Sequence, residues 1–216
     1  MTRKTQQHFI YQPSLFTSMT ETKLNLPDSE IILYENFLNK EEADALYLDL
    51  YRQVEWELRK LFMFGRWIDQ PRLTAFYGDN DKNYQYTGTK WEAHPWIEPL
   101  AQIKDRLVEF IGRPINGVLC NLYRDGQDSC GWHSDAGKSD GTNPQIYSIS
   151  LGQTRIFQIK HNTLPEHSLV NIPLSHGSLL LMGGPMQHHW QHAIPKVRGV
   201  CHPRINLTFR LTQTED

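Results

Sequence analysis

The stretch "RINLTFR" at residues 204–210 decides how this chain has to fold. Side chains of a β-strand point alternately to its two faces, so Ile205, Leu207 and Phe209 share one apolar face. The opposite face is polar and consists of Arg204, Asn206, Thr208 and Arg210. If helices cover the apolar face, the polar face points into a barrel, where two buried guanidinium groups need anionic partners.

A bound anion is the natural partner for these arginines, because the sequence offers few carboxylates near this strand. A guanidinium group matches a carboxylate through two parallel hydrogen bonds, and two such groups along one strand suit a small diacid. An exposed edge strand with solvated arginines is the alternative interpretation. The segment "GVLCNLY" favours a polar ligand, since Asn121 and Tyr123 place an amide and a phenol on one strand face.

The segment "GWHSDAG" at residues 131–137 places His133 and Asp135 on the same side of an extended chain. An isolated pair of this kind is most often a polar turn with an incidental histidine. The later segment "HHWQHAI" supplies candidates for a third ligand, which are His188, His189 and His192. Two imidazoles and one carboxylate with open coordination positions form the facial triad of non-haem Fe(II) oxygenases, unlike a closed structural zinc site.

The order of patterns along the chain predicts a single α+β domain. Residues 1–28 are polar and aperiodic, which indicates an extended N-terminal arm. The spacing of apolar residues predicts helices over 40–61 and about 96–111, the first of them capped by Asn39. Six or more short strands follow, which favours a β-sandwich or jelly-roll core over residues 115–211.

Composition and charge set limits on the function. The chain has a formal net charge of −2 and an isoelectric point of about 6.5, so bulk charge does not indicate a nucleic-acid binder. A local basic and aromatic patch over residues 59–72 suits phosphate contact and stacking, although a half-buried hairpin explains it equally well. No apolar run approaches about 18 residues and no secretory signal is present, so we expect no membrane span.

The cysteines indicate a reducing environment. Cys120, Cys130 and Cys201 belong to no CxxC pair, so they are predicted to be free thiols of an intracellular compartment. That compartment would be the cytoplasm in a bacterium, or the nucleus and cytoplasm in a eukaryote. We expect a monomer.

Together, the HxD pair, the distant histidine and the RxNxTFR strand resemble the AlkB family of Fe(II)/2-oxoglutarate-dependent nucleic-acid dealkylases, in particular its DNA-repair branch. The similarity runs from about residue 60 to 211 and includes "QPRLTAFYG", "NLYRDGQDSCGWHSD", "SISLGQTRIFQ", "HGSLLLMGG", "HHWQHAIPK" and "PRINLTFR". It implies one dioxygenase domain over residues 1–216. In that domain a double-stranded β-helix (jelly-roll) core carries N-terminal helices on one sheet and a β-hairpin nucleotide-recognition lid over residues 60–95.

The resemblance also implies roles for individual residues. His133, Asp135 and His192 match the iron ligands, with His188 and His189 as alternatives for the third position. The residues that match the family's 2-oxoglutarate contacts are Asn121, Tyr123, Arg204, Asn206 and Arg210. The implied cofactors are therefore Fe(II), the co-substrate 2-oxoglutarate and O₂, with succinate and CO₂ as products.

The implied reaction is oxidative demethylation of 1-methyladenine and 3-methylcytosine in DNA, with release of formaldehyde. A base inside a duplex cannot reach a buried iron, so it is flipped out or lies in a single strand. The expected nucleic-acid contacts are Phe64, Arg66, Tyr84, Tyr86 and Ser134. Ordinary hairpin packing is the alternative for the tyrosines, and burial in the core is the alternative for Phe64.

One departure from the family pattern concerns recognition of the lesion. Members of the repair branch usually carry acidic residues directly after the metal-binding aspartate, where this chain has Ala136 and Gly137. An acceptor for the base must then come from elsewhere, and Asp140 is a candidate. RNA or a protein as the substrate, and a metal-bearing protein that binds alkylated nucleic acid without turnover, stay open as alternatives.

Overall fold

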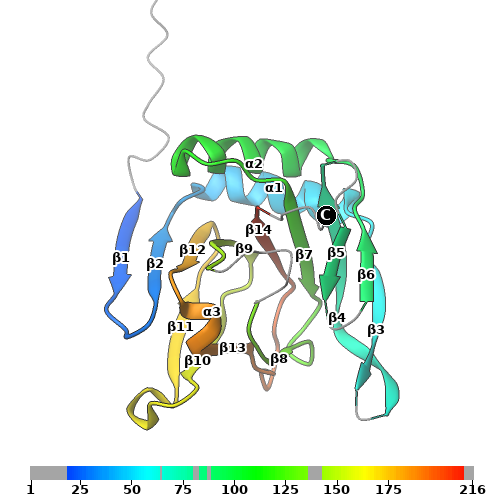
Figure 1. Cartoon of the computed structure of the whole chain (residues 1–216). Helices are drawn as coiled ribbons and strands as arrows, with labels where there is room; N and C mark the ends of the chain where they lie inside the picture. Colours follow the sequence, from blue (N-terminus) through cyan, green and yellow to red (C-terminus); the bar gives the residue numbers. More distant parts are fainter. Residues whose placement is uncertain (1–18, 64, 80–82, 87–88, 136–142, 212–216) are drawn as a thin grey trace, which may run out of the picture.

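Figure 1 shows the computed structural model, which describes residues 19–63, 65–79, 83–86, 89–135 and 143–211. The elements follow one another as β1 (Thr20–Leu24), β2 (Glu30–Glu35), α1 (Lys40–Gln53), β3 (Glu57–Met63), β4 (Arg66–Gly78), β5 (Asn83–Tyr86), β6 (Thr89–Glu92), α2 (Glu98–Ile111), β7 (Gly117–Tyr123), β8 (Cys130–His133), β9 (Ile146–Gly152), β10 (Arg155–His161), a 3₁₀-helix (Pro165–His167), β11 (Val170–Leu174), β12 (Ser178–Gly183), α3 (Met186–His189), β13 (Trp190–Ile194) and β14 (Arg204–Arg210).

Two sheets build the core of the fold. The major sheet has the strand order β1-β2-β12-β9-β14-β7-β4-β3, and the minor sheet has the order β11-β10-β13-β8. Strands that are consecutive in sequence, such as β7 and β8 or β11 and β12, lie in different sheets, as a jelly roll requires. In Figure 1, α1 and α2 lie together across one side of the major sheet. The α+β jelly-roll prediction is confirmed.

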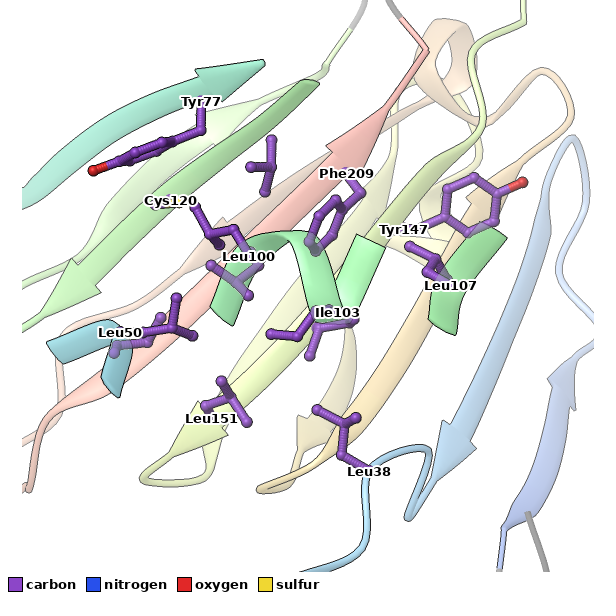
Figure 2. Packing of buried hydrophobic residues seen from close by; sticks show 14 of the residues in the cluster. Leu38, Leu50, Tyr77, Leu100, Ile103, Leu107, Cys120, Tyr147, Leu151 and Phe209 are labelled. Carbon is purple, nitrogen blue, oxygen red and sulfur yellow. The ribbon is translucent and has the colours of Figure 1, made fainter. Parts of the chain in front are cut away.

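The apolar face of β14 anchors the helices to the major sheet. Ile205, Leu207 and Phe209 are each 0% exposed and belong to one hydrophobic cluster with Leu50 of α1 and Ile103 of α2. Figure 2 shows Phe209 above the side chains of α2 in this cluster. Because α1 and α2 cover the apolar face of β14, its polar face points toward the space between the two sheets.

The helix predicted over residues 40–61 is shorter than expected. It ends at Gln53, and Val54 has an extended backbone with φ −71° and ψ 133°. Residues 57–63 form β3 instead, which pairs with β4 through Leu58 and Leu73. The spacing of Leu58 and Leu61 fits either structure locally, and pairing with a strand later in the sequence decides the outcome.

Two further segments differ from their predictions. Within the predicted N-terminal arm, Thr20–Leu24 is a strand that pairs with β2 at the edge of the major sheet. The segment predicted as the strand "HHWQHAI" begins with His188 and His189, the last two residues of α3, and is extended only from Trp190. These two histidines therefore lie outside the strand that carries His192.

The region predicted as a lid contains two hairpins. Strands β3 and β4 form the first and belong to the major sheet, whereas β5 and β6 pair only with each other in a separate two-stranded sheet. Within the described residues, no helix has the length and apolar character needed to cross a membrane.

The start of α1 supports a test of helix stability. Asn39 Oδ1 accepts the Glu42 backbone N–H at 2.9 Å, and Glu42 Oε2 accepts the Asn39 backbone N–H at 3.1 Å. Asn39→Ala removes the side-chain acceptor, so we expect the free energy of unfolding to fall by about 1 kcal/mol. Urea denaturation measures this change. Asn39→Asp keeps an acceptor and serves as the control, and equal losses in both variants would contradict the capping role.

Candidate functional site

The two histidines of the candidate triad come from neighbouring strands of the minor sheet. His133 at the end of β8 is the register partner of His192 in β13, and Asp135 follows two positions later. His133 Nε2 lies 3.6 Å from Asp135 Oδ1, and His192 Nε2 lies 3.8 Å from Asp135 Oδ2. The three ligand atoms all lie within 4.8 Å of one another. Strand pairing therefore brings together residues that are far apart in sequence.

The hydrogen bonds around the triad fix its orientation. His133 Nδ1 donates to the Gly131 carbonyl oxygen at 2.8 Å, which turns Nε2 toward the carboxylate. A metal-binding histidine typically donates its second ring nitrogen in this way. The Asp135 backbone N–H donates to Gln187 Oε1 at 2.8 Å, so α3 holds the HxD segment in place.

The charges in the triad depend on burial and on each other. Burial alone would raise the pKa of the Asp135 carboxyl, but Arg210, His192 and His133 together hold that pKa below its ordinary value. Burial and the charge of His133 lower the pKa of His192 to about 3. Burial opposes protonation of His133, yet Cys130 and Asp135 raise its pKa to about 9. A bound metal ion would take the place of the His133 proton.

One pocket joins the triad to the polar face of β14. It is lined by His133, Asp135, His192, Asn121, Tyr123, Arg204, Asn206 and other residues. Arg210 is 1% exposed, and its Nη2 lies 3.7 Å from Asp135 Oδ2, so this arginine contacts the triad directly. The pocket thus reaches from the three possible metal ligands to the buried guanidinium group of Arg204.

Arg204 gives the clearest indication of an anion-binding site. It is 1% exposed, its Nη2 donates to Ser150 Oγ at 2.9 Å, and its guanidinium lies 5.3 Å from the ring centroid of Tyr123. Burial lowers its pKa to about 10, which leaves it cationic at neutral pH. Its Nε and Nη1 atoms have no hydrogen-bond partner among the described residues. A carboxylate would supply an acceptor and the opposite charge.

Two nitrogen ligands, one carboxylate and a buried guanidinium fit iron together with an acidic co-substrate. The 2OG-Fe(II) oxygenase superfamily matches residues 30–210 of the chain. The mouse protein named DNA oxidative demethylase ALKBH2 is 37% identical over 186 residues, which are 82% of this chain and 78% of that protein. The chain belongs to the AlkB family of Fe(II)- and 2-oxoglutarate-dependent oxygenases.

Further comparisons agree with AlkB membership. The human alpha-ketoglutarate-dependent dioxygenase alkB homolog 3 is 40% identical over 190 residues, which cover 84% of this chain. The matched part spans 66% of that relative's length, slightly less than two thirds. The solved structure of OsALKBH1 has a TM-score of 0.60 at 17% identity and covers 89% of this chain and 100% of its own, which shows the shared fold.

Several residues of this AlkB site were not predicted. Arg72 was grouped with a surface patch, but it is 5% exposed, lines the pocket, and donates from Nε to Asn121 Oδ1 at 2.8 Å. Ser148 accepts a hydrogen bond from Asn206 at 2.8 Å, just as Ser150 accepts one from Arg204. The alternation in "SISLG" and in "QPRLTAF" could have placed these side chains on the inner face.

The predicted nucleic-acid contacts are spread over the lid and the triad. Arg66 is exposed at the start of β4, Ser134 is half-buried between two triad residues, and Tyr84 and Tyr86 lie two positions apart in β5. Phe64, Ala136, Gly137 and Asp140 lie outside the described residues. The roles of all these residues stay predictions.

A second cluster of histidines and an aspartate has the spacing of a metal site, but its hydrogen bonds do not suit metal binding. Ligand atoms of Asp28, His161 and His189 also lie within 4.8 Å of one another. However, His161 Nδ1 accepts backbone N–H groups of Leu164 at 3.0 Å and Thr163 at 3.2 Å. The ring proton then sits on Nε2, which faces Asp28 Oδ2 at 3.3 Å. This tautomer offers no Nε2 lone pair to a metal.

The contrast between the two clusters gives a metal-binding test. His133→Ala removes one ligand of the buried triad, so we expect the affinity for Mn(II) to fall by about a hundredfold or more. His189→Ala changes the second cluster and should leave that affinity unchanged. Equilibrium titration of the apo-protein with Mn(II) measures both. Equal losses in the two variants would contradict the assignment, and circular dichroism checks that each variant is folded.

Proposed function

We propose that the chain catalyses oxidative demethylation of N-alkylated bases in DNA, of the 1-methyladenine and 3-methylcytosine type. The reaction would use Fe(II), 2-oxoglutarate and O₂, and would release succinate, CO₂ and formaldehyde. The single observation that carries the proposal is the pocket that joins the His133, Asp135 and His192 triad to the unsatisfied guanidinium of Arg204. The names of the relatives, a DNA oxidative demethylase and an alpha-ketoglutarate-dependent dioxygenase, support it.

In this proposal His133, Asp135 and His192 hold the metal. Bound iron and 2-oxoglutarate together supply the oxidation of the methyl carbon. Arg210, the two triad histidines and Arg72 favour the ionised carboxylate of Asp135, and Gln187 holds its backbone. These contacts keep the ligand set preorganised before the metal arrives.

The co-substrate would lie on the polar face of β14. Arg204 offers its Nη1 donor and its charge to a carboxylate of 2-oxoglutarate, with Tyr123 beside it. Asn206, fixed by Ser148, forms part of the pocket wall, as does Asn121, which Arg72 holds. We assign Arg210 to the same co-substrate set and, through its contact with Asp135, to orienting the triad.

The substrate would approach over the β3–β4 hairpin. Arg66 and Trp67 are exposed there, Trp67 to 63%, which suits contact with phosphates and bases. We propose that Phe64, Tyr84, Tyr86 and Ser134 complete this nucleic-acid contact. The alkylated strand could be single or double, and RNA is the second candidate substrate.

A non-catalytic binder of alkylated nucleic acid is the main competing function. Such a protein needs no diacid site, whereas this chain buries a cation with two donors that no described residue satisfies, in the pocket of the triad. The pocket therefore favours turnover over binding alone. The monomeric state and the intracellular compartment stay predictions.

Turnover on defined oligonucleotides tests the function directly. With Fe(II), 2-oxoglutarate and O₂, we expect formaldehyde and succinate to form in equal amounts from DNA that contains 3-methylcytosine. Unmethylated DNA and methylated RNA are run beside it. Absence of formaldehyde from all methylated DNA would overturn the proposal, and release from RNA alone would move the substrate class to RNA.

Replacing Arg204 tests the co-substrate site. Arg204→Met removes the buried cation, so we expect KM for 2-oxoglutarate to rise by about a hundredfold, the scale for a buried charged hydrogen bond. Arg204→Lys keeps the positive charge but loses the paired N–H donors of the guanidinium group, so its KM for 2-oxoglutarate should be intermediate. Steady-state succinate release measures KM, and Mn(II) titration checks that the metal affinity is unchanged. An unchanged KM in both variants would contradict the assignment.

A further inference from the structure

The two histidines of the triad are held in different ways. His133 donates its Nδ1 hydrogen to the Gly131 carbonyl oxygen at 2.8 Å, which orients the ring. His192 points Nε2 toward Asp135 Oδ2 at 3.8 Å, but its buried Nδ1 has no hydrogen-bond partner among the described residues. A metal-binding histidine almost always donates its second ring nitrogen to an acceptor. In the described structure, a contact other than a hydrogen bond therefore orients the His192 ring.

A phenylalanine of the neighbouring strand stacks on this ring. The ring centroid of Phe157 in β10 lies 5.1 Å from that of His192, with an angle of 29° between the ring planes. The register pairs Ile159 with His192, so Phe157 is the diagonal neighbour of His192, two positions along β10 on the same face. Both Phe157 and His192 line the pocket. The stack thus lies inside the site.

Phe157 is itself fixed by the core. It is 6% exposed and belongs to one hydrophobic cluster with Ile159 and Ile172. Its register partner in β11 is Ile172, and the strand order places β11 and β13 on opposite sides of β10. Side chains in a close-packed interior occupy defined rotamers. Phe157 therefore gives the His192 ring a rigid surface to pack against.

The orientation of an imidazole is not set by its own torsion. Rotation about the Cβ–Cγ bond of histidine has broad and roughly two-fold minima, so the surroundings select the position of Nε2. The other printed ring contact of His192 is with His133, whose centroid lies 4.2 Å away at an interplanar angle of 62°. That contact joins two ligands to each other. The stack on Phe157 is the contact that ties His192 to the core.

We propose that Phe157 is a positioning residue for the metal site. Its ring holds the His192 imidazole with Nε2 toward the metal, and this packing takes the place of a hydrogen bond to Nδ1. Phe157 acts only through His192. The inference rests on the proposed function, in which His192 is a metal ligand.

Loss of the stacked ring tests the proposal through metal affinity. Phe157→Leu keeps an apolar side chain but removes the aromatic contact, so the affinity of the apo-protein for Mn(II) should fall by about fivefold, the scale of one aromatic pair. Phe157→Tyr keeps the ring and should bind Mn(II) as the wild type does. Equilibrium titration measures both affinities. If Phe157→Leu does not fold, Phe157→Met takes its place with the same expected loss.

A spectroscopic measurement separates positioning from a general loss of core packing. At saturating Co(II), the visible absorption spectrum reports the geometry of the coordinated metal, and it should change in Phe157→Leu. Ile172→Val is the matched control, since Ile172 is 3% exposed and packs on the side of β10 away from His192. This control shortens a core side chain, so its Tm should fall. Its Mn(II) affinity and its Co(II) spectrum should stay those of the wild type.

The outcomes distinguish this inference from the function on which it rests. If the wild type binds no Mn(II), or if His192→Ala binds it as tightly, the proposed metal site fails. If the wild type binds Mn(II) but Phe157→Leu keeps both its affinity and its Co(II) spectrum, the positioning role is overturned. Equal losses of affinity in Phe157→Leu and Ile172→Val, or in Phe157→Leu and Phe157→Tyr, would also overturn it. A loss confined to the variants without the ring supports it.

Discussion

The burial of a guanidinium group on the inner face of β14 is the constraint on which the rest of the site depends. Arg204 is 1% exposed, and the described residues satisfy only part of its hydrogen-bonding capacity. The other face of the same strand holds Phe209 and its neighbours against α1 and α2. Because the side-chain period of a strand is two, core packing and ligand binding are fixed by one register. A slip of one residue would turn the arginines toward the helices and the apolar side chains into the pocket.

The triad depends on a similar coupling between elements. His133 and His192 are register partners, so the pairing of β8 with β13 sets the distance between two ligands. Asp135 lies outside this ladder and is held by Gln187 from α3 and by the charge of Arg210 from β14. The major sheet, the minor sheet and a short helix thus meet at one carboxylate. Its depressed pKa is the result of cationic neighbours outweighing burial.

Sequence reasoning worked where the pattern was local and failed where a distant partner decided the outcome. Alternation along residues 204–210 was enough to assign both faces of β14, and Asn39 marked the start of α1. The end of α1 could not be read in this way, because Leu58 and Leu61 fit a helix until β4 is available for pairing. Arg72 was misjudged although the local alternation in "QPRLTAF" could have placed it on the inner face, where it donates to Asn121 of another strand. The family resemblance supplied roles that spacing alone left open, such as the choice among three histidines.

The measurement that tests the central claim most directly is the free energy of unfolding of Mn(II)-loaded protein with two related acids. 2-Oxoglutarate carries the distal carboxylate that Arg204 would bind, and 2-oxopentanoate has the same keto-acid end without it. At 100 times its Kd, 2-oxoglutarate should raise the free energy of unfolding by about 2.7 kcal/mol, and 2-oxopentanoate at the same concentration should raise it far less. Equal stabilisation by both acids, or none by either, would contradict the account of a buried cation completed by a diacid.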